Sequence, residues 1–123
     1  MGEKMSEEKM KKEEKKSGAL EPAKIHKLAE LVNYSDGSVV SRTIAKTKTA
    51  TVTLFAFDKD QALSEHSAPF DAMVQVLDGE VELVIGGESI ITKAGETVVM
   101  PANIPHGVNA TKQFKMLLTM LRE

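Results

Sequence analysis

The sequence contains no cysteine. Without thiols the chain has no disulfide framework, no thiolate metal site and no cysteine nucleophile, and this absence suits a cytoplasmic location. No apolar run approaches the length of about 20 residues that a membrane-spanning helix needs. The charged N-terminus also lacks the apolar region of a secretion signal. We therefore expect a cytoplasmic protein without a membrane partner.

Positive charge is scarce once the first 16 residues are set aside. The whole chain holds 16 Lys and Arg against 18 Asp and Glu, and its first 16 residues hold 6 Lys and 5 Glu. The remainder therefore carries 10 basic and 13 acidic residues, a net charge of −3. Binding to a phosphate backbone requires clustered positive charge, so we expect no nucleic-acid partner.

The chain is short enough for one domain, and its composition changes near residue 20. Residues 1–17 are almost entirely charged or polar and bury too little apolar surface to offset the entropy of ordering. We expect a flexible charged tail over residues 1–20 and one folded domain over residues 21–123. Within residues 25–32, Ile25, Leu28, Leu31 and Val32 share one helical face, which predicts a short helical turn docked on the domain.

From Ser38 onward the pattern is that of short strands and turns. Residues 49–57 alternate small polar and apolar side chains, and residues 72–78 and 80–85 form two apolar segments separated by Asp78-Gly79. Gly86-Gly87 predicts a further tight turn. Shorter strands are expected at residues 89–92, 97–100 and 114–121. Because no helix of ten or more residues separates the strands, the pattern predicts an all-β sandwich or barrel and excludes a parallel sheet.

Two spaced motifs between Asp60 and Ala110 resemble those of the cupin superfamily. The first motif of that family reads G-x5-H-x-H-x3,4-E-x6-G, and His66 and Gly79 match its first His and its closing Gly. The second reads G-x5-P-x-G-x2-H-x3-N, and Gly95, Pro101 and His106 match it. The segment Ser-Glu-His-Ser-Ala-Pro-Phe-Asp-Ala is similar to a subgroup of small stand-alone cupins. The resemblance implies a single jelly-roll barrel, or double-stranded β-helix, over roughly residues 38–121.

The same alignment shows that half of the usual metal ligands are missing. Members of the family bind a metal through two His and a Glu of the first motif and a His of the second, but here Ala68 and Ala72 replace the second His and the Glu. The resemblance implies that His66 and His106 converge on one interior site. Three readings remain open: a divalent Ni, Zn, Mn, Fe or Cu ion completed by water, a metal-free polar pocket, or a relict pair with a packing role.

Other residues near these motifs are candidates for a pocket. Arg42 in an apolar strand would clamp a ligand carboxylate or form a salt bridge between subunits. Phe70 would cover the pocket or fill the barrel end, and Met100 would line the pocket or fill the core. Asn103 occupies a Gly position of the motif, which predicts a positive φ. Of the nearby carboxylates, Glu65 should face away from His66, and Asp71 is expected to bond the backbone of its own turn.

Three functions follow from the resemblance and the remaining ligands. The first is a small-molecule-binding cupin whose site is assisted by a metal ion. The second is a metal-dependent dioxygenase or isomerase. The third is a dimeric structural or regulatory module, because the edges of the jelly roll and the apolar strand at residues 49–57 need covering. A homodimer is expected in each case.

Overall fold

The computed structural model describes residues 18–122 and shows an all-β, antiparallel barrel. Of the tail predicted over residues 1–20, residues 1–17 lie outside the described residues. Eight strands are preceded by one turn of 3-10 helix, η1, and no helix of the described part is long and apolar enough to cross a membrane. The elements are η1 (Leu28–Glu30), β1 (Val39–Lys46), β2 (Ala50–Phe57), β3 (Ala62–His66), β4 (Ala72–Ile85), β5 (Glu88–Lys93), β6 (Thr97–Met100), β7 (His106–Asn109) and β8 (Phe114–Leu121).

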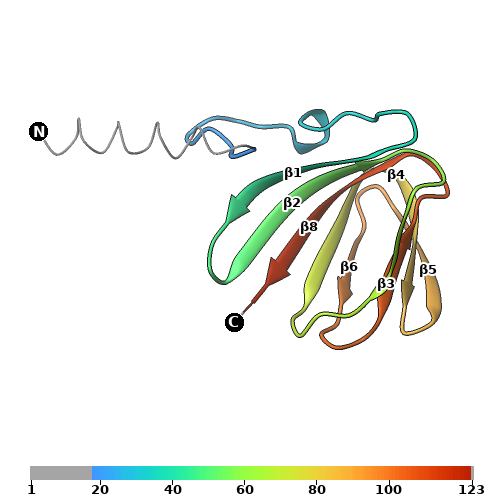
Figure 1. Cartoon of the computed structure of the whole chain (residues 1–123). Helices are drawn as coiled ribbons and strands as arrows, with labels where there is room; N and C mark the ends of the chain where they lie inside the picture. The colour runs from blue at the N-terminus through green and yellow to red at the C-terminus, as the bar shows by residue number, and fades with distance from the viewer. Residues whose placement is uncertain (1–17, 123) are drawn as a thin grey trace, which may run out of the picture.

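The strands form two curved sheets that share β4. In the pairing order β1-β2-β8-β4-β7-β3, β6 pairs with the first half of β4 and β5 with its second half. Figure 1 shows the two sheets enclosing a common interior. This architecture confirms the all-β barrel that the sequence predicts.

The prediction of a turn at Asp78-Gly79 is wrong, because β4 runs through both residues as one bent strand of 14 residues. Its register against β8 shifts between Val76 and Asp78, and Gly79 has φ +71°. The bulge and the glycine bend the strand from one sheet into the other without ending it. The predicted turn at Gly86-Gly87 is confirmed, and both glycines have positive φ values.

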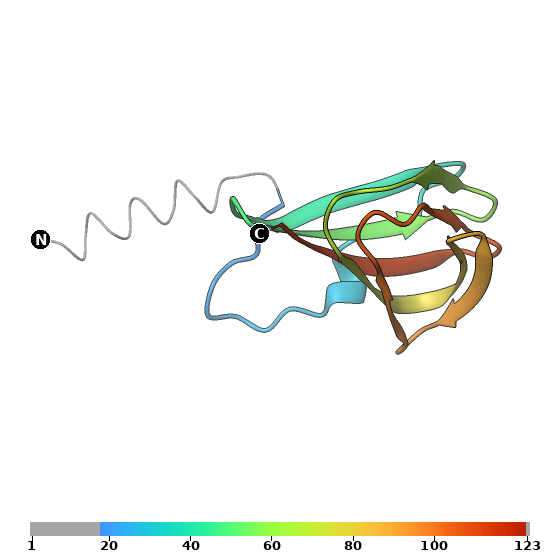
Figure 2. The same cartoon turned by 90° about the horizontal axis from the view of Figure 1, so that it is seen from below.

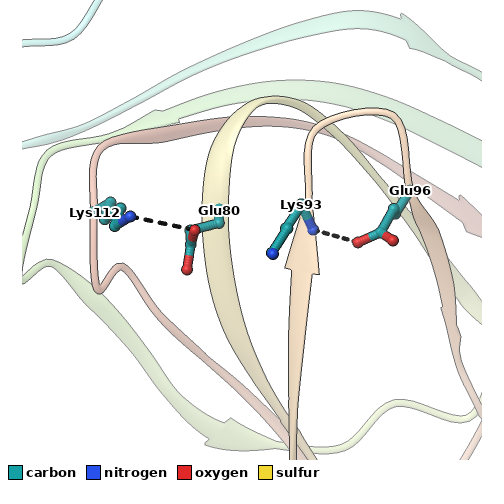
Figure 3. A network of polar contacts seen from close by, with 4 residues as sticks. All are labelled: Glu80, Lys93, Glu96 and Lys112. Carbon is teal, nitrogen blue, oxygen red and sulfur yellow. Dashed lines mark hydrogen bonds and ion pairs between the residues drawn. The ribbon is translucent and has the colours of Figure 1, made fainter.

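The barrel interior is apolar and closes around stacked aromatic rings. Phe57 and Phe114 are fully buried, and their ring centroids lie 4.7 Å apart. At the end of the barrel where these two rings stack, the Lys112 ammonium contacts the Glu80 carboxylate at 3.3 Å. The Lys93 amide donates to Glu96 Oε1 at 2.7 Å (Figure 3). Because Lys112 is largely exposed, this ion pair adds little stability, and the aromatic packing closes this end.

The segment before β1 covers the outer face of β2. Leu54 and Ala56 point outward from the barrel and are buried against Val32, with Leu28 and Leu31 packed beside them. Figure 2 shows this N-terminal segment, in blue, lying outside the barrel. The docked turn is therefore present, but it is shorter than predicted.

The predicted contact of Ile25 with the domain is wrong. Ile25 is 96% exposed, because η1 spans only three residues and the chain before it does not continue the helical face. The segment is held instead at Tyr34, whose hydroxyl donates to Asp78 Oδ2 at 2.5 Å. The Lys115 ammonium lies 5.0 Å from the centroid of the Tyr34 ring and donates to the Ala29 carbonyl.

Candidate functional site

Two histidines meet on the inner surface of the barrel. His66 ends β3 and His106 begins β7, and the two are directly paired in the antiparallel ladder. Their ring centroids lie 4.6 Å apart with the planes inclined at 68°. The convergence that motif register implies for these residues is therefore present in the structure.

A β-bulge turns His66 toward the interior. Leu63 pairs with Val108 and His66 with His106, so two residues of β3 oppose the single residue Gly107 of β7. Without the extra residue, strict alternation from the inward Leu63 would point His66 outward. The Glu65 side chain lies over the outer face of Gly107, where a Cβ would meet Glu65 Cγ at 3.2 Å.

Each imidazole is oriented by a nearby backbone carbonyl. His66 Nδ1 donates to the Ser64 carbonyl at 3.0 Å, and His106 Nδ1 donates to the Ile104 carbonyl at 3.3 Å. When Nδ1 carries the proton, Nε2 of a neutral ring has a free lone pair. His106 Nε2 is not among the buried side-chain polar atoms without a partner in the described residues, and His66 is exposed.

The two rings differ in exposure, which affects their charge. His106 is 5% exposed, whereas His66 is exposed. Burial lowers the pKa of His106 from its usual value near 6.5, the positive charge that His66 can carry lowers it further, and the bond to the Ile104 carbonyl partly opposes both. His106 is therefore neutral at pH 7 and available as an acceptor.

The loop at residues 67–71 directly follows His66 and the loop at residues 101–105 directly precedes His106. Together with the C-terminal end of β8 they form what we call the histidine end of the barrel. The Asn103 amide donates to the Ala68 carbonyl at 2.7 Å and joins the two loops. Asn103 has φ +64°, which confirms the positive φ predicted from its place in a Gly position. Figure 1 shows that both loops and the C-terminus lie at the same end of the molecule.

The donor set does not fit a resident metal centre with three or four protein ligands. Within residues 18–122, no group of three His, Cys, Asp or Glu side chains is placed to hold a metal ion. Asp71 Oδ1 accepts the Ala102 amide at 2.8 Å and so links the two loops. Ala68 and Ala72 supply no donor. Two imidazoles alone occupy only part of the shell of a catalytic zinc or a non-haem iron.

The structure places Phe70, Met100 and Asn103 at or beneath the histidine end, and it places Arg42 elsewhere. Met100 is 3% exposed and pairs with Ala72, so it lies in the core beneath this end. Phe70 lies in the loop at residues 67–71 and faces the C-terminal segment. Arg42 points from the outer face of β1, where its Nε donates to the Gly18 carbonyl at 2.9 Å.

Arg122 is a site residue that the sequence analysis missed. Phe114, Met116, Leu118 and Met120 point inward from β8, and Arg122 continues this alternation just beyond the strand. Its Nη2 donates to Thr51 Oγ1, and its guanidinium carbon lies 5.8 Å from the centroid of the Phe70 ring. The period-two pattern of residues 114–122 is the signal that would have found it.

An open cavity of about 640 Å³ lies beside this arginine at the histidine end. Its wall combines one cation, one carboxylate and several apolar side chains. The lining residues are Pro69, Phe70, Asp71, Ala102, Leu121 and Arg122.

Sequence and structure comparisons identify relatives of the chain. A sequence profile described as a cupin domain matches residues 53–121. A conserved protein of unknown function from Streptococcus pyogenes is 36% identical, with a TM-score of 0.82 over 87% of this chain and 94% of that one. A cupin 2 conserved barrel domain protein from Leptotrichia buccalis is 44% identical, with a TM-score of 0.75 over 76% of this chain and 46% of that longer chain.

A cupin superfamily protein from Desulfitobacterium hafniense shares the fold at 23% identity. Its TM-score is 0.81 over 88% of this chain and 99% of that one. Curated proteins provide no match to the sequence.

Proposed function

Because the chain belongs to the cupin family, we propose that it is a small-molecule-binding protein in which His66 and His106 hold a ligand at the histidine end of the barrel. The observation that supports this function is the pair of rings 4.6 Å apart, each with Nδ1 bonded to its own backbone. Such rings are held in place before a ligand arrives, so little side-chain entropy is lost on binding.

The chemistry of the pair indicates the kind of ligand group that it accepts. A neutral imidazole whose Nδ1 is protonated accepts a hydrogen bond at Nε2. Two such acceptors side by side suit a ligand with O–H or N–H groups, such as a hydroxyl, an amide or a protonated acid. The core beneath this end includes Met100 and Ala72 and is apolar, so the remainder of the ligand is small and mainly apolar.

The histidine ring protons provide a direct test. The chain has three histidines, so three Hε1 signals are expected in a proton–carbon NMR spectrum of the full chain. Titration with a panel of small hydroxy, amide and carboxylic compounds should shift the signals of His66 and His106 and leave that of His26 in place. His26 is a matched control, because it binds the Glu21 carbonyl in the N-terminal segment.

The variants His66→Ala and His106→Ala assign the signals and should each weaken the binding of any compound found. A panel in which no compound moves the His66 and His106 signals would count against the proposed function. So would a compound that binds His26→Ala, His66→Ala and His106→Ala with equal affinity.

A second candidate is a metal-assisted form of the same site. The bonds from both Nδ1 atoms to carbonyls support it, since metal-binding histidines commonly donate their second ring nitrogen in this way. An exchangeable Ni, Zn, Mn, Fe or Cu ion would be held by two imidazoles, with water or ligand completing its shell. Such an ion would be the basis of a dioxygenase or isomerase activity.

Calorimetric titration of the full chain with Zn²⁺ or Ni²⁺ tests this candidate. One ion per chain should bind, and both His66→Ala and His106→Ala should abolish binding, whereas His26→Ala should not. Binding that survives in either of the first two variants would contradict a metal held by the pair.

The homodimer also remains a proposal. Val99 is 54% exposed on β6 and Leu121 is 56% exposed at the end of β8, outside the area that the N-terminal segment covers. Val99 pairs with Met73, and Met73 pairs with Thr119, two positions before Leu121, so both side chains belong to the outer face of one sheet. A contiguous apolar face of this kind is typical of an interface. Sedimentation of the full chain and of Val99→Glu tests it: a dimer that dissociates in the variant is expected, and a wild-type monomer at all concentrations would refute it.

A further inference from the structure

We propose that Arg122 binds the carboxylate of a small ligand, with the ring of Phe70 packed against the ligand's apolar part. This inference goes beyond the proposed function, because neither His66 nor His106 lines the cavity beside Arg122. It assigns the ligand a class: a compact molecule with one carboxylate and a flat apolar group.

The position of Arg122 supports this assignment. The residue continues the inward face of β8, and its amide donates to the Thr49 carbonyl at 2.5 Å, which holds the backbone beside β2. The bond from Nη2 to Thr51 Oγ1 then fixes the guanidinium. A guanidinium fixed in this way presents its remaining N–H groups to the cavity.

A guanidinium prefers a carboxylate because its parallel N–H groups match the two oxygens. The ion pairs formed among residues 18–122 do not include Arg122. Its bond to Thr51 uses one of five N–H donors, so a bidentate contact with a ligand remains available. The site is therefore suited to a carboxylate in its geometry as well as in its charge.

Apolar side chains define the shape of the ligand. Phe70, Pro69 and Leu121 line the same cavity, and the Phe70 ring already lies 5.8 Å from the guanidinium carbon. A flat group would lie against the Phe70 ring while its carboxylate bonds to Arg122. The volume of about 640 Å³ suits a small molecule rather than a peptide.

Asp71 is the one acidic group in the cavity wall, and its charge opposes an anion. Its Oδ1 accepts a hydrogen bond from the Ala102 amide, which partly offsets the effect of its negative charge. Asp71→Asn keeps an oxygen for that amide and removes the charge. Carboxylate binding should therefore become tighter in this variant, whereas a site for cations would be weakened.

Benzoate and its uncharged analogue benzamide test the proposal in an amide NMR titration of the full chain. Benzoate should produce saturable shifts at the amides of residues 70–71, 102 and 121–122, with an affinity about tenfold above that of benzamide. Arg122→Gln should remove this difference. Arg122→Lys should retain only part of it, because an ammonium lacks the guanidinium fork.

Arg42→Gln is the matched control, because Arg42 is a partly buried arginine on the outer face of β1. It should leave the preference for benzoate unchanged. Equal binding of benzoate and benzamide, absence of shifts at the cavity, or a preference that survives in Arg122→Gln would each overturn the proposal. The spectra also report whether each variant is folded.

His66→Ala separates this proposal from the proposed function. If the cavity prefers benzoate in both the wild type and His66→Ala, the Arg122 site stands whether or not the histidines bind a ligand. If the histidine signals respond to ligands but Arg122→Gln has no effect on any of them, the proposed function stands and this inference fails.

Discussion

Thr92 lies in β5 with 2% of its surface exposed, and its Oγ1 has no hydrogen-bond partner among the described residues. A buried hydroxyl without a partner costs about 1–3 kcal/mol relative to its hydrated state. Valine has nearly the same shape, favours strands and carries no polar atom. Thr92→Val should therefore raise the free energy of unfolding by about 1 kcal/mol.

Thr53→Val is the control for this prediction. Thr53 is also buried, but its hydroxyl is bonded to that of Thr43 at 3.3 Å. This substitution should leave the stability unchanged or lower it. Urea unfolding of the two variants measures both effects, and a Thr92→Val protein no more stable than the wild type would show that the hydroxyl is satisfied.

The lowered pKa of His106 predicts a dependence of stability on pH. The folded state disfavours the charged ring, so below the usual pKa near 6.5 the unfolded chain binds more protons. The stability that the neutral ring contributes is present above pH 6.5 and is lost as the pH falls through the lowered pKa of the folded state. The loss begins near pH 6.5, above the range in which the carboxylates titrate.

Urea unfolding between pH 7.5 and pH 5 measures this effect. The wild type should lose stability across the window, and His106→Gln should lose less. His26→Gln should follow the wild type. Equal slopes for the wild type and His106→Gln would mean that His106 is free to protonate in the folded protein.

At the scale of an element, Gly79 determines whether β4 spans both sheets. A Cβ at this position would collide with the carbonyl oxygen of Gln113, and the backbone has φ +71°. Gly79→Ala should therefore cost about 3 kcal/mol or more, because the strained φ and the backbone collision combine. The collision involves backbone atoms, which side-chain rotation cannot relieve.

Gly87 is the matched control for this substitution. It has φ +83°, and a Cβ there meets no atom within 4 Å. Gly87→Ala should cost only about 1 kcal/mol, the penalty of the positive φ alone. Thermal unfolding of both variants checks the comparison, and similar losses at the two positions would refute the role given to the Gln113 contact.

At the scale of the whole molecule, the N-terminal segment is part of the barrel's stability. Val32 is 3% exposed and covers Leu54 and Ala56, which are fully buried on the outer face of β2. Deletion of residues 1–36 would expose this face and remove the bond from Tyr34 to Asp78. The expected loss is about 3 kcal/mol, from two to three apolar side chains returned to water.

Deletion of residues 1–17 is the control, since their composition offers little apolar surface to bury. This shorter deletion should leave the melting temperature within about 2 °C of the wild type. Equal melting temperatures for the two deletions would show that the outer face of β2 needs no cover.

The sequence by itself predicts the fold class, because strand alternation and turn residues are local signals. Gly86-Gly87 and the alternating residues 49–57 needed no tertiary information. The resemblance to the cupin motifs also implies that His66 and His106 converge. The four-residue strand β7 was missed, since His106–Asn109 is too short for a period of two to be recognised.

Only the tertiary structure decided which way the site residues face. The bulge opposite Gly107 turns His66 inward, and such a bulge depends on pairing between strands that lie 40 residues apart in the chain. The directions of Arg42 and Arg122 also depend on tertiary packing. Alternation along a strand separates its two faces but does not show which face lies in the interior. Packing of Val32 on Leu54 makes the face of Arg42 the outer one, and the inward row of β8 brings Arg122 to the histidine end.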